Sequence, residues 1–336
     1  MPDIHNNRCT IHDVARLAGV SHVTVSRAFS KNASIAGETR AKVLEAAGRL
    51  GYRPNPLARG LRGGRTKSLA VIGSLDGAGL SGLYRLLALR LQGRGYVVSV
   101  IDAIGGGDYI KEALAGCASR NVDGVVLDGW PGDGFEELLG SFSAVAVITG
   151  ERLDVGFDQV VRERGLAIRA IADHFVDTGR RCPGVIANVP GEDYKVRPFV
   201  GRLKERGISV LLDGVVNLDI GVAGARIDLV GKALDEAFVG GFPLDSLFCS
   251  TDEVAVAAMC WLGERGLSVP GDVAVVGFND DKFGKYLRPG LASVARHNEQ
   301  VVDALEKMLM GRLEEGVAVV SSEVVPMEFV VRGSAG

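Results

Sequence analysis

The sequence has few cysteines, and they form no recognisable pattern. The five, Cys9, Cys117, Cys182, Cys249 and Cys260, are scattered, with no Cys-x-x-Cys pair and no histidine at zinc-ligand spacing. Their odd number argues against a disulfide framework and suits a reducing compartment. We interpret each as a small buried hydrophobic residue and expect no metal site.

Long apolar runs are also missing. No stretch approaches the roughly 18–20 residues that a membrane-spanning helix needs. The first fifteen residues, MPDIHNNRCTIHDVA, are polar and lack the apolar core of a signal peptide. We therefore expect a cytoplasmic protein that does not enter a membrane.

What the chain does have is an apolar fraction of 47% over 336 residues and 46 glycines, enough for two or three cores joined by many turns. Its net charge of −3 hides a division. Residues 1–67 contain 12 Lys and Arg against 4 Asp and Glu, a charge of +8, and the remainder carries −11. A basic head on an acidic body predicts that only the head meets a polyanion.

The head contains the local signals of two short helices. Thr10 and Asp13 form a capping box, and Gly19 suits the end of that helix. Ser21 is a good cap for a second helix over 22–29, which leaves an interhelix turn of three or four residues. This spacing predicts a helix-turn-helix, although an ordinary helical hairpin has the same geometry.

Two longer strings distinguish these alternatives. TIHDVARLAGVSHVTVSRAF (10–29) and TRAKVLEAAGRLGYRPNPLARGLRGGRTKSLAVIG (39–73) resemble the DNA-binding head and hinge of the lac repressor (LacI/GalR) family. The resemblance implies that 22–29 is the recognition helix, with Arg27 reading guanine in the major groove. It implies DNA contacts by Thr10, Ser21, His22, Val23, Thr24, Ser26 and Arg27. The sequence departs from the family's pattern at Ser30 and Ala36.

The hinge region begins at Asn55-Pro56, a cap followed by a proline at the first helical position. A helix of about eight residues is shorter than the roughly 12–15 needed for stability alone, so we expect it to fold on DNA. The resemblance implies that it pairs with its dimer mate in the minor groove, where Leu61 wedges a base step open. The implied contact residues are Asn55, Leu57, Ala58, Leu61 and Arg62.

The body alternates apolar, β-rich runs with helical stretches. One series of strands is expected at 69–73, 96–102, 123–129 and 144–150, and another at 183–189, 209–215, 246–252 and 272–280. Continuous apolar strands between helices predict two doubly wound parallel-sheet lobes with a cleft at the strand ends. The string 248–295 resembles the family's sensor domain, itself similar to periplasmic sugar-binding proteins.

The predicted fold class is thus a small all-α helix-turn-helix head on an α/β sensor. We divide the chain into an extension (1–8), the DNA-binding domain (9–54), hinge and linker (55–67) and the effector-binding and dimerisation domain (68–332). The resemblance implies three crossings between lobes, near 160–166, 293–297 and 319–323. Lobe one then takes about 68–163 and 295–320, and lobe two about 164–294 and 321–332.

The effector pocket is less well defined by the sequence. Arg197 matches an arginine that binds sugar hydroxyls or a carboxylate in the family, whereas Asn279 stands where an aspartate is usual. Trp130 follows a strand and suits stacking on a sugar ring. The candidate set is Asp76, Trp130, Arg197, Ile220, Thr251 and Asn279. The departures argue against a simple hexose and leave open a degenerate sensor without a ligand.

One motif points elsewhere. Residues 77–82 spell G-x-G-x-x-G, and Asp102 follows at a spacing that imitates a dinucleotide-binding fingerprint. Because residues 74–76 separate the motif from the preceding strand, we interpret it as a loop of the cleft wall. We expect no cofactor and no enzyme, with an NAD-dependent enzyme bearing an accessory head as the alternative.

The predicted function is a homodimeric repressor that binds a palindromic operator and responds to a sugar or related metabolite. The paired hinge helices and two-fold half-sites require the dimer.

Overall fold

The computed structural model describes residues 9–29, 33–53, 65–75, 78–103, 106–187, 193–208, 215–217 and 227–336. The chain divides into two units, Met1–Thr66 and Lys67–Gly336. The extension 1–8 lies outside the described residues, as do seven of the expected contact residues: Asn55, Leu57, Ala58, Leu61, Arg62, Asp76 and Ile220.

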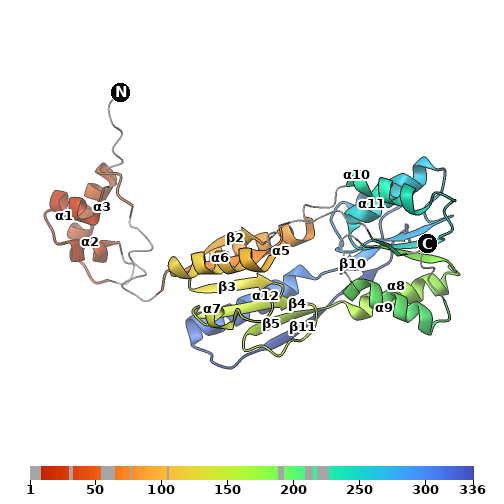
Figure 1. Cartoon of the computed structure of the whole chain (residues 1–336). Coiled ribbons are helices and arrows are strands. Elements are labelled where there is room, and N and C mark those ends of the chain that lie inside the picture. The colour runs from red at the N-terminus through yellow and green to blue at the C-terminus, as the bar shows by residue number, and fades with distance from the viewer. Residues whose placement is uncertain are drawn as a thin grey trace. The chain divides into compact units, whose positions relative to one another are not determined.

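The described part of the first unit is a cluster of three helices around one small core (Figure 1). The helices are α1 (Ile11–Ala18), α2 (His22–Ala28) and α3 (Gly37–Arg49). Each contributes apolar residues three or four positions apart, so that one face of each helix is buried. The core consists of Val14, Ala15, Val25, Ala28, Val43, Ala46 and Ala47.

The first lobe of the second unit is built on a six-stranded sheet in the order β11-β5-β4-β3-β1-β2, with every pair parallel. Its strands are β1 (Ser68–Gly73), β2 (Val97–Asp102), β3 (Gly124–Asp128), β4 (Ala144–Thr149), β5 (Asp158–Glu163) and β11 (Ser322–Pro326). Its helices are α5 (Ala78–Gly93), α6 (Gly106–Ser119), α7 (Glu136–Leu139) and α12 (Asn298–Met310), the last followed by η3 (Gly311–Glu315).

Both faces of this sheet are covered, as a doubly wound fold requires. Leu69 and Val71 of β1 pack with α5 and α12, whereas Ala70 and Ile72 pack with α6 and with Leu139 of α7. Alternate residues of a strand point to opposite faces, so a strand buried on both sides needs the continuous apolar run that the sequence has.

Among its described residues, the second lobe repeats this plan with four parallel strands in the order β7-β6-β8-β9. The strands are β6 (Pro183–Ala187), β7 (Val215–Asn217), β8 (Ser246–Cys249) and β9 (Ala274–Val276). The helices are α8 (Gly165–Asp177), α9 (Asp193–Glu205), α10 (Ile227–Ala237), α11 (Asp252–Glu264) and η2 (Gly284–Tyr286). Helices α8 and α9 cover one face and α10 and α11 the other. A two-stranded antiparallel sheet joins β10 (Ser293–Ala295) to β12 (Glu328–Val330).

One expected lobe boundary is wrong. The sequence placed residues 321–332 in the second lobe, but β11 lies at the edge of the first sheet and pairs in parallel with β5. Val325 of β11 is buried in the core of the first lobe, which explains why the strand belongs there. The chain enters the second lobe only after Pro326, where Met327 joins that lobe's core.

Among the described helices, none combines the length and the apolar character needed to cross a bilayer. The described side chains also contain no group of three or more His, Cys, Asp or Glu residues arranged to hold a metal ion.

Candidate functional site

The turn between α1 and α2 is fixed by short-range hydrogen bonds. The backbone N–H and the hydroxyl of Thr10 donate to the Asp13 carboxylate at 2.9 and 2.7 Å, and these bonds lower the pKa of Asp13. Gly19 ends α1 with φ +66°, a conformation that favours glycine. Ser21 accepts a hydrogen bond from the Thr24 N–H at 3.1 Å and caps α2. The helix-turn-helix predicted from the sequence is therefore confirmed.

Helix α2 presents the expected DNA-reading side chains on its outer face. Val25 and Ala28 are buried, whereas Ser21, Val23 and Arg27 are exposed. The other three expected contacts of this helix, His22, Thr24 and Ser26, are half-buried. The Arg27 side chain has no hydrogen bond or ion pair to another described residue, so its donors are available to a ligand.

The second unit contains a cleft of about 610 Å³ at the carboxyl ends of β3, β4 and β5. The lining residues are Asp128, Gly129, Trp130, Ile148, Thr149, Gly150, Glu151, Leu153, Arg162, Glu163, Arg164, Gly165, Tyr194, Arg197 and Pro198. Loops and helix starts that follow parallel strands form the ligand crevice of doubly wound sheets. The cleft brings together two of the expected effector residues, Trp130 and Arg197.

A buried polar chain forms one wall of this cleft. The Tyr84 hydroxyl donates to the Asp128 carboxylate at 2.8 Å, and Arg162 donates to the other oxygen of the same carboxylate. Burial raises the pKa of Tyr84 strongly, and the neighbouring Asp128 charge adds to the effect. A Cβ on Gly73 would overlap the Tyr84 hydroxyl, so this approach requires glycine.

The remaining described candidates, Thr251 and Asn279, do not line the cleft. Thr251 caps α11 by accepting a hydrogen bond from the Val254 N–H at 3.2 Å. Asn279 is buried with φ +121° and accepts a hydrogen bond from Arg296. Burial lowers the pKa of Arg296 to about 10, and the nearby charge of Arg162 acts in the same direction.

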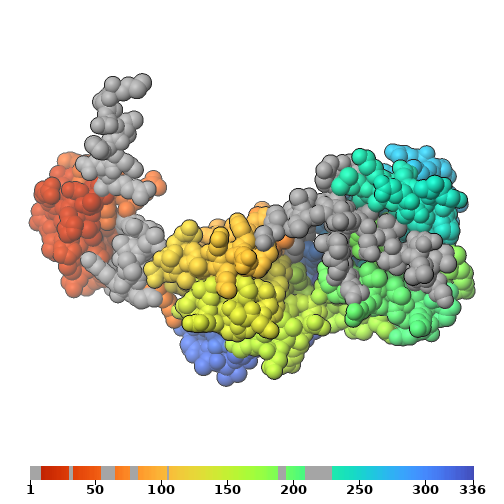
Figure 2. Space-filling view, in the orientation of Figure 1, coloured from red at the N-terminus to blue at the C-terminus, as the bar shows by residue number. Residues whose placement is uncertain are grey.

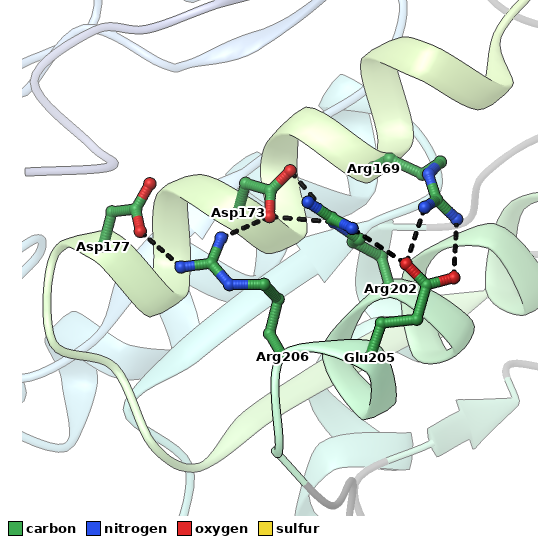
Figure 3. Close-up of polar contacts among 6 residues, drawn as sticks. All are labelled: Arg169, Asp173, Asp177, Arg202, Glu205 and Arg206. Carbon is green, nitrogen blue, oxygen red and sulfur yellow. Dashed lines mark hydrogen bonds and ion pairs between the residues drawn. The ribbon is translucent and has the colours of Figure 1, made fainter.

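Ion pairs fix the helix that brings Arg197 to the cleft (Figure 3). Arg202 of α9 donates to Asp173 of α8 at 2.9 Å, and Glu205 accepts from Arg169 and Arg202 at 2.6 and 2.8 Å. Arg206 also contacts Asp173 and donates to Asp177 at 2.6 Å. The hydrogen bonds from Arg169 and Arg202 lower the pKa of Glu205 to about 2.

These contacts tie one end of α9 to α8, while its other end contributes Tyr194, Arg197 and Pro198 to the cleft. The two helices form one continuous part of the visible surface of the second lobe (Figure 2). The ion-pair network thus anchors the helix that carries Arg197 against α8.

The sequence did not single out Asp128, Thr149, Arg162, Arg164 or Tyr194 as site residues. A usable signal was present for the first four, since each stands at or just beyond the carboxyl end of an apolar strand. No comparable signal marks Tyr194, because nothing local shows that α9 faces this cleft.

Comparison with protein families agrees with both parts of this structure. Residues 10–55 match the model described as bacterial regulatory proteins, lacI family, and residues 172–335 match the periplasmic binding protein-like domain. The chain thus combines a lacI-family helix-turn-helix domain with a periplasmic-binding-protein-like domain. Because this family consists of transcriptional regulators, the chain is a regulator and not an enzyme.

A lacI-family relative, the HTH-type transcriptional repressor PurR of Proteus mirabilis (strain HI4320), is 27% identical over 319 residues, which cover 90% of each chain. The solved lac repressor dimer bound to operator and the anti-inducer ONPF superposes with a TM-score of 0.81 at 21% identity, covering 98% of this chain and 99% of that one. The structure of the transcriptional regulator CelR in complex with cellobiose superposes with a TM-score of 0.68 at 24% identity. The match covers 97% of this chain and 100% of that one. At these identities the two structures establish the shared fold.

Most of the G-x-G-x-x-G motif that imitates a dinucleotide-binding fingerprint lies in a helix. Residues 78–82 belong to α5 and do not form the cleft-wall loop that the sequence suggested. Asp102 accepts a hydrogen bond from the Leu75 N–H at 3.2 Å, which ties the segment after β1 to the end of β2.

Proposed function

We propose that the chain is a sequence-specific repressor that binds a palindromic operator as a homodimer and responds to a small molecule in the cleft. The observation that carries the proposal is the outer face of α2, where Arg27 is exposed and has no partner among the described residues. Its guanidinium can donate two hydrogen bonds to guanine O6 and N7. The basic charge of residues 1–67 supplies the accompanying attraction to phosphates.

The other proposed contacts divide by chemistry. Ser21, Thr24 and Ser26 carry short hydroxyls suited to phosphates, which set the register of the helix on DNA. Val23 offers an apolar contact suited to a thymine methyl group, and His22 adds donors to the same end of α2. The remaining proposed DNA contacts are Thr10 at the start of α1 and the hinge residues Asn55, Leu57, Ala58, Leu61 and Arg62.

Dimerisation is supported by an exposed apolar edge. Strand β2 lies at the end of the first sheet, and its Val97 and Val100 are 63% and 39% exposed. Leu89 of α5, the helix that precedes this strand, is 52% exposed. An unpaired strand edge with large apolar side chains favours association with another surface. A second copy of the chain would cover this edge and would also supply the DNA-binding head for the second half of the operator.

Effector control is supported by the position of the cleft. Its lining includes 162–165, the segment that joins β5 of the first lobe to α8 of the second. A ligand held there contacts the crossing itself, together with residues of both lobes. It changes DNA affinity only if it binds one lobe arrangement more tightly than the other. In this proposal the protein acts on operator DNA in the cytoplasm.

Selection of operators from random DNA tests the proposal. The full chain is expected to enrich a two-fold symmetric sequence. Arg27→Ala should relax specificity at a single base position in each half-site and cost about 1–3 kcal/mol on the selected operator. Arg49→Ala is the control, since it removes the same charge from α3, where Arg49 pairs with Glu45. Failure to enrich any symmetric sequence, with only strongly salt-dependent binding, would contradict the proposed function.

A further inference from the structure

The cleft wall contains a half-buried cation, Arg164, on the segment between β5 and α8. Its Cζ lies 4.1 Å from the centroid of the Tyr194 ring. On another side the guanidinium occupies the space next to Gly150 so closely that a Cβ there would overlap it. An aromatic ring and a bare backbone thus hold the guanidinium in position without supplying a carboxylate.

The carboxylates of Glu151 and Glu163 lie close enough to favour the charged form of Arg164, but neither pairs with it directly. Arg164 forms no ion pair and no hydrogen bond with any described residue. The neighbouring arginine of the lining, Arg162, is already paired with Asp128. Glu163 accepts the Leu166 N–H at 3.3 Å at the start of α8. Burial lowers the pKa of Arg164, because it removes water that would stabilise the charged form, and the nearby charge of Arg162 acts in the same direction.

A second polar group in the cleft also lacks a partner. Thr149, at the end of β4, is 7% exposed, and its Oγ1 forms no hydrogen bond with a described residue. Thr149 and Arg164 line the same cleft. Buried hydroxyls in native proteins are nearly always hydrogen-bonded, so a partner from outside the chain is the natural complement. The carboxylate of Glu151, which also lines the cleft, is exposed to solvent.

We propose that the effector is a small organic anion whose carboxylate or phosphate oxygens accept hydrogen bonds from the Arg164 guanidinium and the Thr149 hydroxyl. This inference rests on the proposed effector function and names the ligand class of that site. An oxyanion neutralises the half-buried cation and satisfies the buried hydroxyl together. A neutral ligand leaves Arg164 without a direct ion pair in a site from which it displaces water.

Isothermal titration of the full chain tests the inference with four anions: inorganic phosphate, 3-phosphoglycerate, succinate and citrate. Glucose and adenine serve as neutral probes. We expect at least one anion to bind more tightly than both neutral probes. Preference for the first two probes identifies a phosphate ligand, and preference for the last two a carboxylate.

Variants of the chain test which side chains bind the oxygens of the anion. Arg164→Gln removes a charged donor from the cleft and should weaken anion binding about 10- to 150-fold. Thr149→Val keeps the shape of the side chain and should weaken it about 2- to 10-fold. Arg152→Gln is the matched control, because Arg152 is exposed in the loop between β4 and β5, next to the cleft residue Glu151, and does not itself line the cleft. Its affinity should stay within about twofold of the wild-type value.

The failures of the two proposals are distinguishable. If a neutral probe binds more tightly than the anions and Arg164→Gln does not change its affinity, the proposal of an anionic effector is wrong. The proposal of effector control would still stand. If none of the six probes binds but a symmetric operator is still selected, the proposal of an anionic effector is wrong and the proposed DNA-binding function stands. If Arg164→Gln fails to fold by circular dichroism, Arg164→Lys and Thr149→Val decide. Unchanged anion affinity in both would also overturn the inference.

Discussion

A buried carboxylate in the second lobe makes a quantitative prediction about the pH dependence of stability. Asp252 is fully buried at the first turn of α11 and accepts hydrogen bonds from the Ser293 hydroxyl and the Asp281 N–H at 2.5 and 2.6 Å. Burial raises the pKa of Asp252 from 3.8 to about 6, and the charges of Asp281 and Asp280 contribute in the same direction. The two hydrogen bonds oppose this shift without cancelling it.

The sign follows from proton binding. Between pH 3.8 and about 6 the folded protein holds the Asp252 proton more tightly than the unfolded chain does. The free energy of unfolding therefore falls as the pH rises through this window. From this upward shift of the pKa, we expect the free energy of unfolding to be about 3 kcal/mol lower at neutral pH than at a pH well below 3.8.

Asp252→Asn removes this titration and keeps the size of the side chain. The asparagine oxygen can accept the Asp281 N–H, while its amide donates to the Ser293 hydroxyl, which is able to rotate. We expect the stability of the variant relative to wild type to increase by about 2.4 kcal/mol between pH 4 and pH 7, most of the full effect of the shift.

Urea unfolding measures this difference in a Trp130→Phe background, where Trp261 of α11 is the remaining tryptophan and reports on the same lobe. The Asp272→Asn variant is the control. Asp272 is an aspartate of the same lobe whose pKa is lowered by hydrogen bonds from Ser268, so its pH profile should have the opposite sign. Parallel pH profiles of wild type and Asp252→Asn would refute the reasoning.

Three further changes test other parts of the structure. Gly73→Ala places a Cβ against the Tyr84 hydroxyl and should reduce the free energy of unfolding by about 1–3 kcal/mol, whereas Gly93→Ala, with open space around it, should not. Glu205→Gln removes the acceptor of two arginines; because the pKa of Glu205 is lowered to about 2, the stability difference from wild type should be full above pH 4.5 and vanish as the pH falls through 2. Val97→Asp puts a charge on the exposed edge of β2 and should shift the chain towards monomer in sedimentation velocity.

Each of these has an outcome that contradicts it. Equal unfolding midpoints for the two glycine variants would show that the cleft wall tolerates a side chain at β1. A stability difference for Glu205→Gln that persists at pH 2 would mean that the glutamate acts through packing and not through charge. Dimers of Val97→Asp as tight as those of wild type would place the interface elsewhere.

The sequence by itself determined the head and the architecture of the body. Thr10, Gly19 and Ser21 act on backbone groups a few residues away, so their roles can be read without knowing the rest of the fold. The apolar strand runs likewise report burial on both faces, which only a helix-covered parallel sheet provides. The resemblance of residues 10–29 and 39–73 to the lac repressor family added the interpretation of the head as a DNA-binding domain.

Tertiary structure alone decided which strands are neighbours and which side chains meet in the cleft. Strand β11 lies far from β5 in the sequence, and nothing in its alternation shows that it closes the first sheet rather than the second. Arg164, Thr149 and Tyr194 come from three separate segments, and their chemistry depends on what surrounds them. Burial and the absence of a direct ion pair are properties of packing, which depends on contacts between residues that are distant in the sequence.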